Sequence, residues 1–150
     1  MRIPDIIERL SDRIGIDSKK AVEFFKFSVV GATGVGVNMG LLYVLTRFLG
    51  LQVEWASPIA IEVSILSNFM LNNYWTFVKR DTNVKFGARL VRYHLVTGLA
   101  GLVNYGTLLL LVKAFHMNDM LANLIGILLG TIINYLLNSL WTWQKSPENT

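Results

Sequence analysis

Four long runs of this sequence are almost free of charged side chains, and no other feature restricts the possible folds as strongly. They cover approximately residues 27–46, 55–77, 93–112 and 120–143. A helix of about 20 apolar residues crosses the hydrocarbon core of a bilayer, and a segment inside lipid must satisfy its backbone hydrogen bonds internally. The sequence therefore predicts an all-α integral membrane protein with four spanning helices.

Charge is scarce and unevenly placed. Charged residues make up 16% of the chain, whereas a soluble domain usually carries about 25%. The net charge of +4 comes from basic residues beside the apolar runs rather than from a soluble basic face. We therefore expect anionic lipids as partners and no nucleic acid.

The basic residues also indicate an orientation. The segment before the first run holds six, the central loop five and the tail one: Arg2, Arg9, Arg13, Lys19, Lys20, Lys26; Lys79, Arg80, Lys85, Arg89, Arg92; and Lys145. The other two loops hold one each, Arg47 and Lys113. Because loops rich in Lys and Arg stay in the cytoplasm, we expect a multi-pass protein of the cytoplasmic (inner) membrane with both termini in the cytoplasm.

The N-terminal segment has a helical pattern of its own. Apolar residues recur at helical spacing among acidic and basic ones at Ile3, Ile6, Ile7, Leu10 and Ile14. This pattern predicts an amphipathic helix over residues 1–24 that lies on the cytoplasmic interface. A tail that docks a partner, or a poorly ordered one, is the alternative.

The remaining chain is internally duplicated. A shift of 66 residues aligns 25–79 with 91–145 without a gap, and 15 of the 55 pairs are identical. Each repeat holds two spans, so both repeats enter the membrane from the same side. We therefore expect parallel repeats related by a pseudo-two-fold axis along the membrane normal. The predicted parts are 1–24, repeat 25–79, basic loop 80–90, repeat 91–145 and tail 146–150.

The best-matched part of the duplication is a polar pattern at the end of each repeat. Helical positions i, i+4, i+7 and i+11 share a face. This spacing predicts one stripe of Asn68, Asn72, Trp75 and Lys79 and a second of Asn134, Asn138, Trp141 and Lys145. We interpret these ends as headgroup pockets, with candidate residues Lys26, Arg92, Lys79, Arg80, Asn72, Asn138, Trp75 and Trp141. An interfacial Trp commonly serves only as an anchor, and that interpretation remains open.

Five polar residues lie deeper in the predicted spans: Asn38, Asn68, Asn104, Asn134 and Glu62. At 1.5 Å per residue, Asn38 and Asn68 lie roughly 17 Å from the cytoplasmic edge. They could hydrogen-bond across the hairpin, as could Asn104 with Asn134, or simply hold the helices together. Glu62, whose counterpart in the second repeat is Leu128, is a functional candidate, unless it reaches outward to the membrane surface.

No pattern in the sequence indicates catalysis. His94 and His116 have no Cys, Asp or Glu at metal-ligand spacing, and no catalytic set of residues is present. The glycines at 31–36 suit close helix packing better than nucleotide binding. We therefore expect no metal, no cofactor and no enzymatic activity.

Three stretches carry a family resemblance: Phe-Lys-Phe-Ser-Val-Val-Gly at 25–31, Asn38, and the run 68–77. They resemble the signature of the GtrA-like family of small four-span membrane proteins. The resemblance implies a polyprenyl-phosphate glycosyltransferase as partner, and polyprenyl (undecaprenyl) phosphate or its glycosylated form as ligand. It also implies translocation of that lipid-linked sugar for cell-surface polysaccharides.

Two other functions remain as alternatives. The protein could be a non-transporting anchor or scaffold for the glycosyltransferase, or a small proton-coupled exporter that uses Glu62. Four short spans make a thin wall around any pathway, so we also expect a homo-oligomer.

Overall fold

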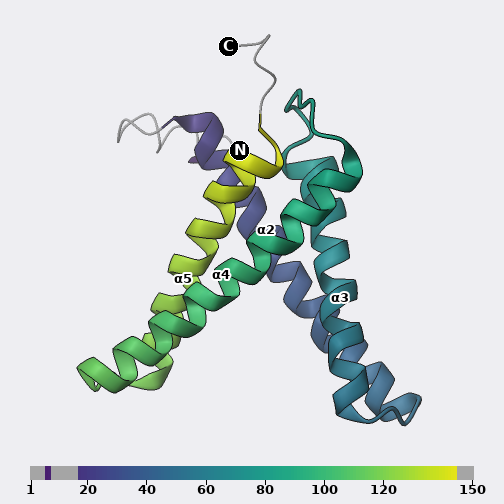
Figure 1. Ribbon diagram of the computed structural model, residues 1–150, viewed down its shortest axis with the longest axis vertical. Helices are drawn as coiled ribbons and strands as arrows, with labels where there is room; N and C mark the ends of the chain where they lie inside the picture. Colours follow the sequence, from purple (N-terminus) through teal and green to yellow (C-terminus); the bar gives the residue numbers. More distant parts are fainter. Residues whose placement is uncertain (1–5, 8–16, 145–150) are drawn as a thin grey trace. The chain divides into compact units, whose positions relative to one another are not determined.

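The computed structural model describes residues 6–7 and 17–144. Every regular element in these residues is helical, as predicted. The elements are α2 (Ser18–Tyr43), η1 (Val44–Phe48), α3 (Val53–Leu71), η2 (Asn72–Thr76), α4 (Phe86–Phe115), α5 (Asp119–Leu137) and η3 (Asn138–Thr142) (Figure 1). The three η elements are π-helical turns that continue the α-helix before them.

Two expectations fall partly outside these residues. Ile6 and Ile7 are helical, but most of the predicted amphipathic helix over 1–24 lies outside the described residues, as does Lys145. Residues 18–24 belong to α2, the first long helix. Helix α4 begins at Phe86, inside the segment that we expected to be a loop.

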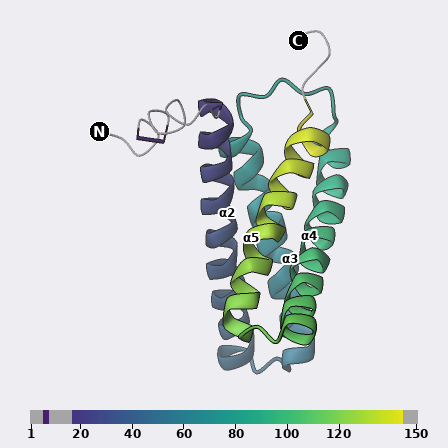
Figure 2. The ribbon, with the colours of Figure 1, turned by 90° about the vertical axis from the view of Figure 1, so that its left-hand side faces the viewer.

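The chain divides into two compact units, Met1–Val78 and Lys79–Thr150. In the first, α2 packs against α3, and in the second, α4 packs against α5. Each pair is an antiparallel hairpin, because a short connection reverses the chain between its two helices (Figures 1 and 2). The site residues are positioned by these two hairpins.

The helix ends are set by local chemistry. The Asp17 side chain accepts a hydrogen bond from the Lys19 backbone N–H at 3.0 Å and starts α2, while Asn118 caps α5 in the same way. Both hairpin turns use one left-handed residue, Gly50 with φ 65° and His116 with φ 50°. Such a residue ends a helix and reverses the chain, which keeps both turns short.

Three helical stretches are long and apolar enough to cross a membrane: Ser18–Phe48, Phe86–Phe115 and Asp119–Thr142. The predicted second span is not among them. Together α3 and η2 run from Val53 to Thr76, and a helix of this length extends roughly 36 Å. However, Glu54, Glu62 and several asparagines reduce its hydropathy. Its length fits a spanning helix, but its composition is more polar than that of the three stretches above.

The core of each unit is a narrow strip between two helices. Small residues such as Ala56 and Ala60 in α3, and Ala122 and Gly126 in α5, are buried and allow close helix approach. Larger buried side chains cluster toward the open end of each hairpin, away from its turn. They are Phe27, Phe69 and Phe77 in the first unit and Tyr93, Tyr135 and Trp143 in the second. Many other large apolar side chains are exposed, as expected where lipid is the solvent.

Candidate functional site

In the first unit, a cation lies over an indole ring at the open end of the hairpin. The Lys26 Nζ atom is 5.5 Å from the centre of the Trp75 ring. The rings of Phe27, the next residue after Lys26, and Phe77 pack with their centres 6.2 Å apart. Lys26 follows the first turns of α2, and Trp75 lies in η2, so neighbouring helix ends bring the two together.

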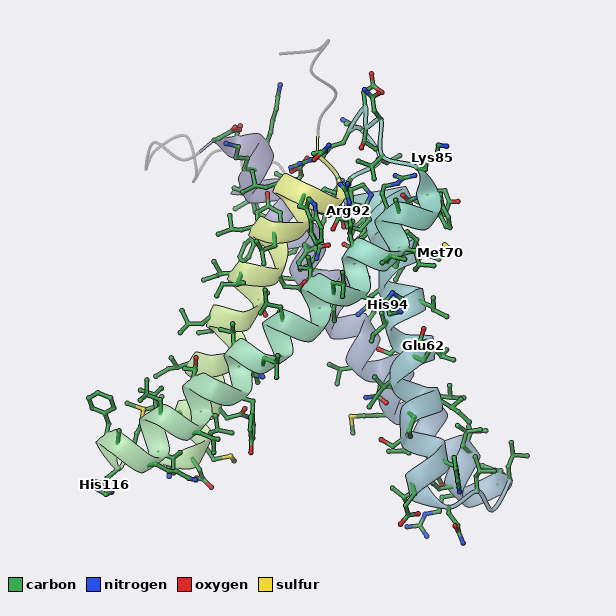
Figure 3. The ribbon with its side chains drawn as sticks, viewed as in Figure 1. Glu62, Met70, Lys85, Arg92, His94 and His116 are labelled. Carbon is green, nitrogen blue, oxygen red and sulfur yellow. The ribbon has the colours of Figure 1, made fainter. Side chains whose placement is uncertain are left out.

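The second unit repeats this arrangement at the positions 66 residues later. The Arg92 guanidinium lies 5.2 Å from the centre of the Trp141 ring. The rings of Tyr93, the next residue after Arg92, and Trp143 pack with their centres 5.8 Å apart. Arg92 lies near the same end of α4 as Lys85, and His116 marks the opposite end (Figure 3). Both units therefore place a positive charge beside an amphipathic ring.

Trp75 and Trp141 remain accessible in these pairs. Trp75 is 42% exposed and Trp141 is 41% exposed. A cation over an indole face is attracted by the ring quadrupole, and it keeps part of its hydrogen-bonding capacity for another group. Each pair could therefore hold an anionic headgroup oxygen against the cation while the ring contacts apolar chain.

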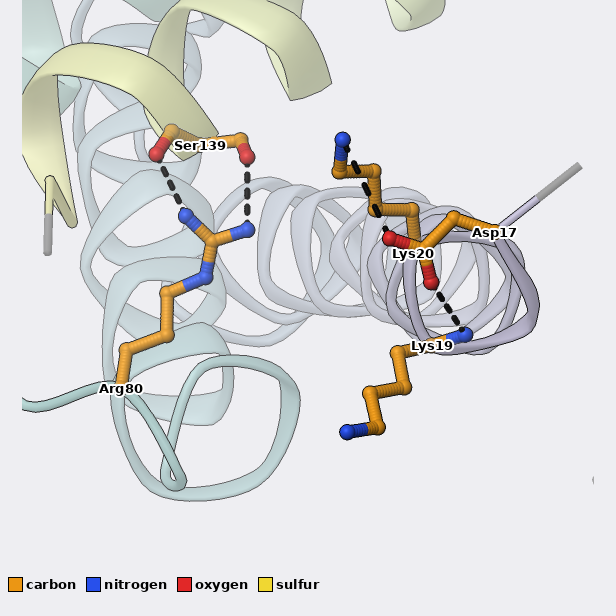
Figure 4. Close-up of polar contacts among 5 residues, drawn as sticks. All are labelled: Asp17, Lys19, Lys20, Arg80 and Ser139. Atoms are coloured by element: carbon orange, nitrogen blue, oxygen red, sulfur yellow. Dashed lines mark hydrogen bonds and ion pairs between the residues drawn. The ribbon is translucent and has the colours of Figure 1, made fainter. Parts of the chain in front are cut away.

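Arg80 has a different role from the one predicted. Its guanidinium donates to the Ser139 backbone oxygen at 2.5 Å and to Ser139 Oγ at 2.7 Å (Figure 4). It also donates to the Trp143 backbone oxygen at 3.2 Å. The last carbonyls of a helix have no partner within the helix. Arg80 therefore caps η3 and ties the start of the loop to the second unit.

Lys79, which the predicted stripe included, lies beyond the helix. The helical segment ends at Thr76, and Lys79 is exposed. The prediction of one face from Asn68 to Lys79 was wrong because η2 is a π-helical turn. Its bond from the Phe77 N–H to the Asn72 carbonyl, at 2.8 Å, places one extra residue in the turn.

Asn72 and Asn138 are buried rather than accessible. Asn72 is 1% exposed and Asn138 is 0% exposed. The Asn138 Nδ2 atom donates to the Asn134 backbone oxygen at 3.0 Å and to Asn134 Oδ1 at 2.8 Å. These two asparagines start the π-helical turns η2 and η3. Because they are buried, they do not themselves face a headgroup.

The deeper asparagines pack differently from the prediction. The predicted hydrogen bonds, Asn38 to Asn68 and Asn104 to Asn134, are not formed. The Asn68 amide instead lies against Gly34, where a Cβ would overlap it. The Asn104 carbonyl oxygen lies against Gly126 in the same manner. Both oxygens, Asn68 Oδ1 and Asn104 Oδ1, are buried without a hydrogen-bond partner.

Glu62 lies partway along α3 (Figure 3). Its side chain is exposed and is not part of the strip that packs on α2. Ser64, two residues later, makes the contact that sequence reasoning missed, since its Oγ donates to the Gly34 backbone oxygen at 2.8 Å. The available signal was the spacing of small residues, because Ala56, Ala60 and Ser64 recur every fourth residue and therefore share one helix face.

The described residues offer no site for a metal ion, because no group of three His, Cys, Asp or Glu side chains comes together among them. What they offer is two cations, Lys26 and Arg92, each on an accessible indole. This chemistry suits binding of an anion at a membrane surface.

Comparisons with known proteins agree with a membrane role. The family model described as GtrA/DPMS, transmembrane domain, matches residues 26–143. A dolichol-phosphate mannosyltransferase of Pyrococcus furiosus is 37% identical over 119 residues, which cover 79% of this chain and 33% of that protein. The membrane protein YwcD of Bacillus subtilis is 20% identical over 123 residues, which cover 81% of this chain and 97% of YwcD. The chain thus spans a third of the length of the mannosyltransferase.

Proposed function

Because the chain belongs to the GtrA/DPMS transmembrane family, we propose that it binds a polyprenyl phosphate or its sugar-linked form in the membrane. The family match confirms the resemblance found in the sequence. The observation that carries the proposal is the cation held over an accessible indole in each unit, Lys26 on Trp75 and Arg92 on Trp141. A phosphate needs such a cation, and an interfacial indole suits the first isoprene units of the lipid.

We also propose that the chain moves the bound lipid-linked sugar across the cytoplasmic membrane. The sugar is then used for the glycosylation of cell-surface polysaccharides. In this arrangement α3 is a fourth span, the two hairpins are parallel repeats, and both termini face the cytoplasm, as the distribution of Lys and Arg supports. The chain itself catalyses no sugar transfer and works with a polyprenyl-phosphate glycosyltransferase. Copies of the chain associate to enclose the pathway.

One observation favours a second candidate function. The chain matches only 33% of the length of the mannosyltransferase, so two thirds of that protein lie outside the match. A membrane segment joined to an enzyme can serve purely to hold the enzyme at the membrane. The alternative is therefore an anchor that binds the lipid for a glycosyltransferase without moving it.

Native mass spectrometry of the purified chain with undecaprenyl phosphate tests lipid binding. The variant Lys26→Gln with Arg92→Gln should bind at least about tenfold more weakly, since each charge-assisted contact contributes strongly. Lys26→Arg retains the charge over Trp75 and should bind like the wild type. Lys113→Gln removes an exposed cation at the other end of the second unit and serves as the matched control. Undiminished binding of undecaprenyl phosphate by the double Gln variant would contradict the proposal.

A liposome assay separates translocation from anchoring. Vesicles that contain only this chain receive a fluorescent short-chain polyprenyl-phosphate sugar in one leaflet. If the chain translocates lipid, the fluorescence becomes accessible to a quencher on the other side faster than in protein-free vesicles. Equal rates with and without the protein, together with normal lipid binding, would support the anchor function instead.

A further inference from the structure

The second unit contains a pocket between α4 and α5 that the cation–indole pair does not use. Its volume is about 240 Å³. Its polar side chains are Thr97 and Asn104 from α4 and Thr131 and Asn134 from α5, beside the small residues Ala100 and Gly101. None of the residues that line it is charged.

The pocket lies beside the middle of α4, a helix with the length and hydropathy of a membrane span. Helix α4 runs from Phe86 to Phe115. Thr97 and Asn104 each lie 11 residues from the nearer end of this helix, which is roughly 17 Å along its axis. A group in this pocket would therefore be far from both headgroup regions.

The lining is polar without being charged, because it combines two hydroxyls, Thr97 and Thr131, with two amides, Asn104 and Asn134. Polar side chains at this depth in a membrane are costly unless something binds to them. Hydroxyl groups both donate and accept hydrogen bonds, so a neutral group with several hydroxyls suits this lining. A phosphate would not, because the pocket offers no cation to neutralise it.

The lining differs from the first unit at several positions, since Gly31, Gly34, Val35, Ser64 and Ile65 correspond to Thr97, Ala100, Gly101, Gly130 and Thr131. One of these differences concerns an asparagine. In the first unit the Asn68 amide lies against Gly34, where any Cβ would overlap it. The counterparts 66 residues later are Asn134 and Ala100. The Ala100 methyl group prevents Asn134 from taking the position of Asn68, and Asn134 Oδ1 instead accepts a hydrogen bond from Asn138 at 2.8 Å. The space beside Ala100 is left open.

We propose that this pocket holds the sugar ring of a polyprenyl-phosphate-linked sugar as it crosses the membrane. This inference rests on the proposed function and adds a site for the uncharged part of the ligand. The volume of 240 Å³ is below the roughly 300 Å³ at which ordinary small-molecule pockets begin. The pocket therefore takes one sugar ring rather than an oligosaccharide.

The first test compares undecaprenyl phosphate with and without one attached glucose, by native mass spectrometry of the full chain. The wild type should bind the glucose-linked lipid about tenfold more tightly, as two or three additional hydrogen bonds predict. Thr97→Val with Thr131→Val keeps the shape of the lining and removes its hydroxyls, so this preference should disappear. Asn38→Ala alters the counterpart of Asn104 and should leave the preference unchanged.

A filling variant provides a second, independent readout. Gly101 lines the pocket and a Cβ on it meets no atom within 4 Å, so Gly101→Leu places a side chain in this space. The probe is octyl glucoside that carries a diazirine, which has a sugar and an alkyl chain but no phosphate. In the wild type it should label peptides that contain residues 97–104 or 127–134, and in Gly101→Leu this labelling should fall at least about fivefold, because the leucine occupies the space.

The outcomes separate the pocket from the proposed function. Equal binding of the two lipids to the wild type, or labelling that Gly101→Leu leaves unchanged, overturns the sugar pocket and leaves lipid binding intact. Failure of both lipids to bind overturns the proposed function. In that case, labelling of the pocket by the glucoside, and its loss in Gly101→Leu, would still support a site for a neutral hydroxylated group.

Discussion

Arg92 holds Trp141 by two contacts at once. Its guanidinium lies 5.2 Å from the centre of the indole ring, and its Nη1 donates to the Trp141 backbone oxygen at 2.8 Å. Lys26 makes only the ring contact with Trp75, at 5.5 Å. Arginine presents several donors in a planar group, whereas lysine is a compact charge on a flexible stem. The second unit therefore fixes its tryptophan more firmly than the first.

Substitution of Arg92 should test this difference. Arg92→Ala removes both contacts and should lower the free energy of unfolding in detergent micelles by about 1–2 kcal/mol. Lys26→Ala removes one exposed ring contact and should cost under about 1 kcal/mol. Denaturant titration followed by Trp fluorescence measures both values. Equal losses in the two variants would contradict the assignment of a structural role to the Arg92–Trp141 backbone hydrogen bond.

The cap provided by Arg80 gives a second prediction. Arg80→Ala leaves the Ser139 and Trp143 carbonyls at the end of η3 without their donor, and it should destabilise the chain by about 1–3 kcal/mol. Ser139→Ala removes only the hydroxyl contact and should cost less. The adjacent Lys79 is exposed, so Lys79→Ala is the control and should change little. The same denaturant titration measures these changes in the free energy of unfolding. A loss of stability in Lys79→Ala as large as in Arg80→Ala would refute the capping role of Arg80.

The sequence predicted the helices and the residues of the site better than their orientations. Long apolar runs specify helices in lipid because no other open structure satisfies the backbone there. Lys26 does meet Trp75 in the first unit, and Arg92 meets Trp141 in the second. The polar stripe was wrong because it assumed uniform helical spacing through Asn72 and Asn138, where the π-helical turns begin. One inserted residue leaves no periodic signal in the sequence.

The orientation of the deeper asparagines also could not be predicted from the pattern along a single helix. Whether Asn68 or Asn134 lies against the facing helix depends on the residue opposite, which is Gly34 in one unit and Ala100 in the other. This contact crosses between helices and follows no spacing along the chain. The difference of one methyl group was present in the aligned repeats, but only the packed hairpins show its consequence.

Asn138 gives a third prediction, because it is fully buried and donates two hydrogen bonds to Asn134. Asn138→Asp keeps the shape but places a carboxylate against two acceptors, so it should cost about 2–4 kcal/mol near neutral pH. Asn118→Asp is the control, since an Asp caps a helix N-terminus as well as an Asn does, and it should be nearly neutral. Thermal unfolding in detergent compares them, and similar midpoints for the two variants would rule out the buried donor role.

Gly34 and Gly36 give the sharpest comparison in the first unit. A Cβ on Gly34 would overlap the Asn68 amide, whereas a Cβ on Gly36 meets nothing within 4 Å. Gly34→Ala should therefore destabilise the hairpin by about 1–3 kcal/mol through overpacking, and Gly36→Ala should stabilise it by up to about 1 kcal/mol through helix propensity. Adding Asn68→Ala to Gly34→Ala removes the overlap and should recover most of the loss. If Gly34→Ala alone matched Gly36→Ala in chemical denaturation, the close contact between Gly34 and Asn68 would be disproved.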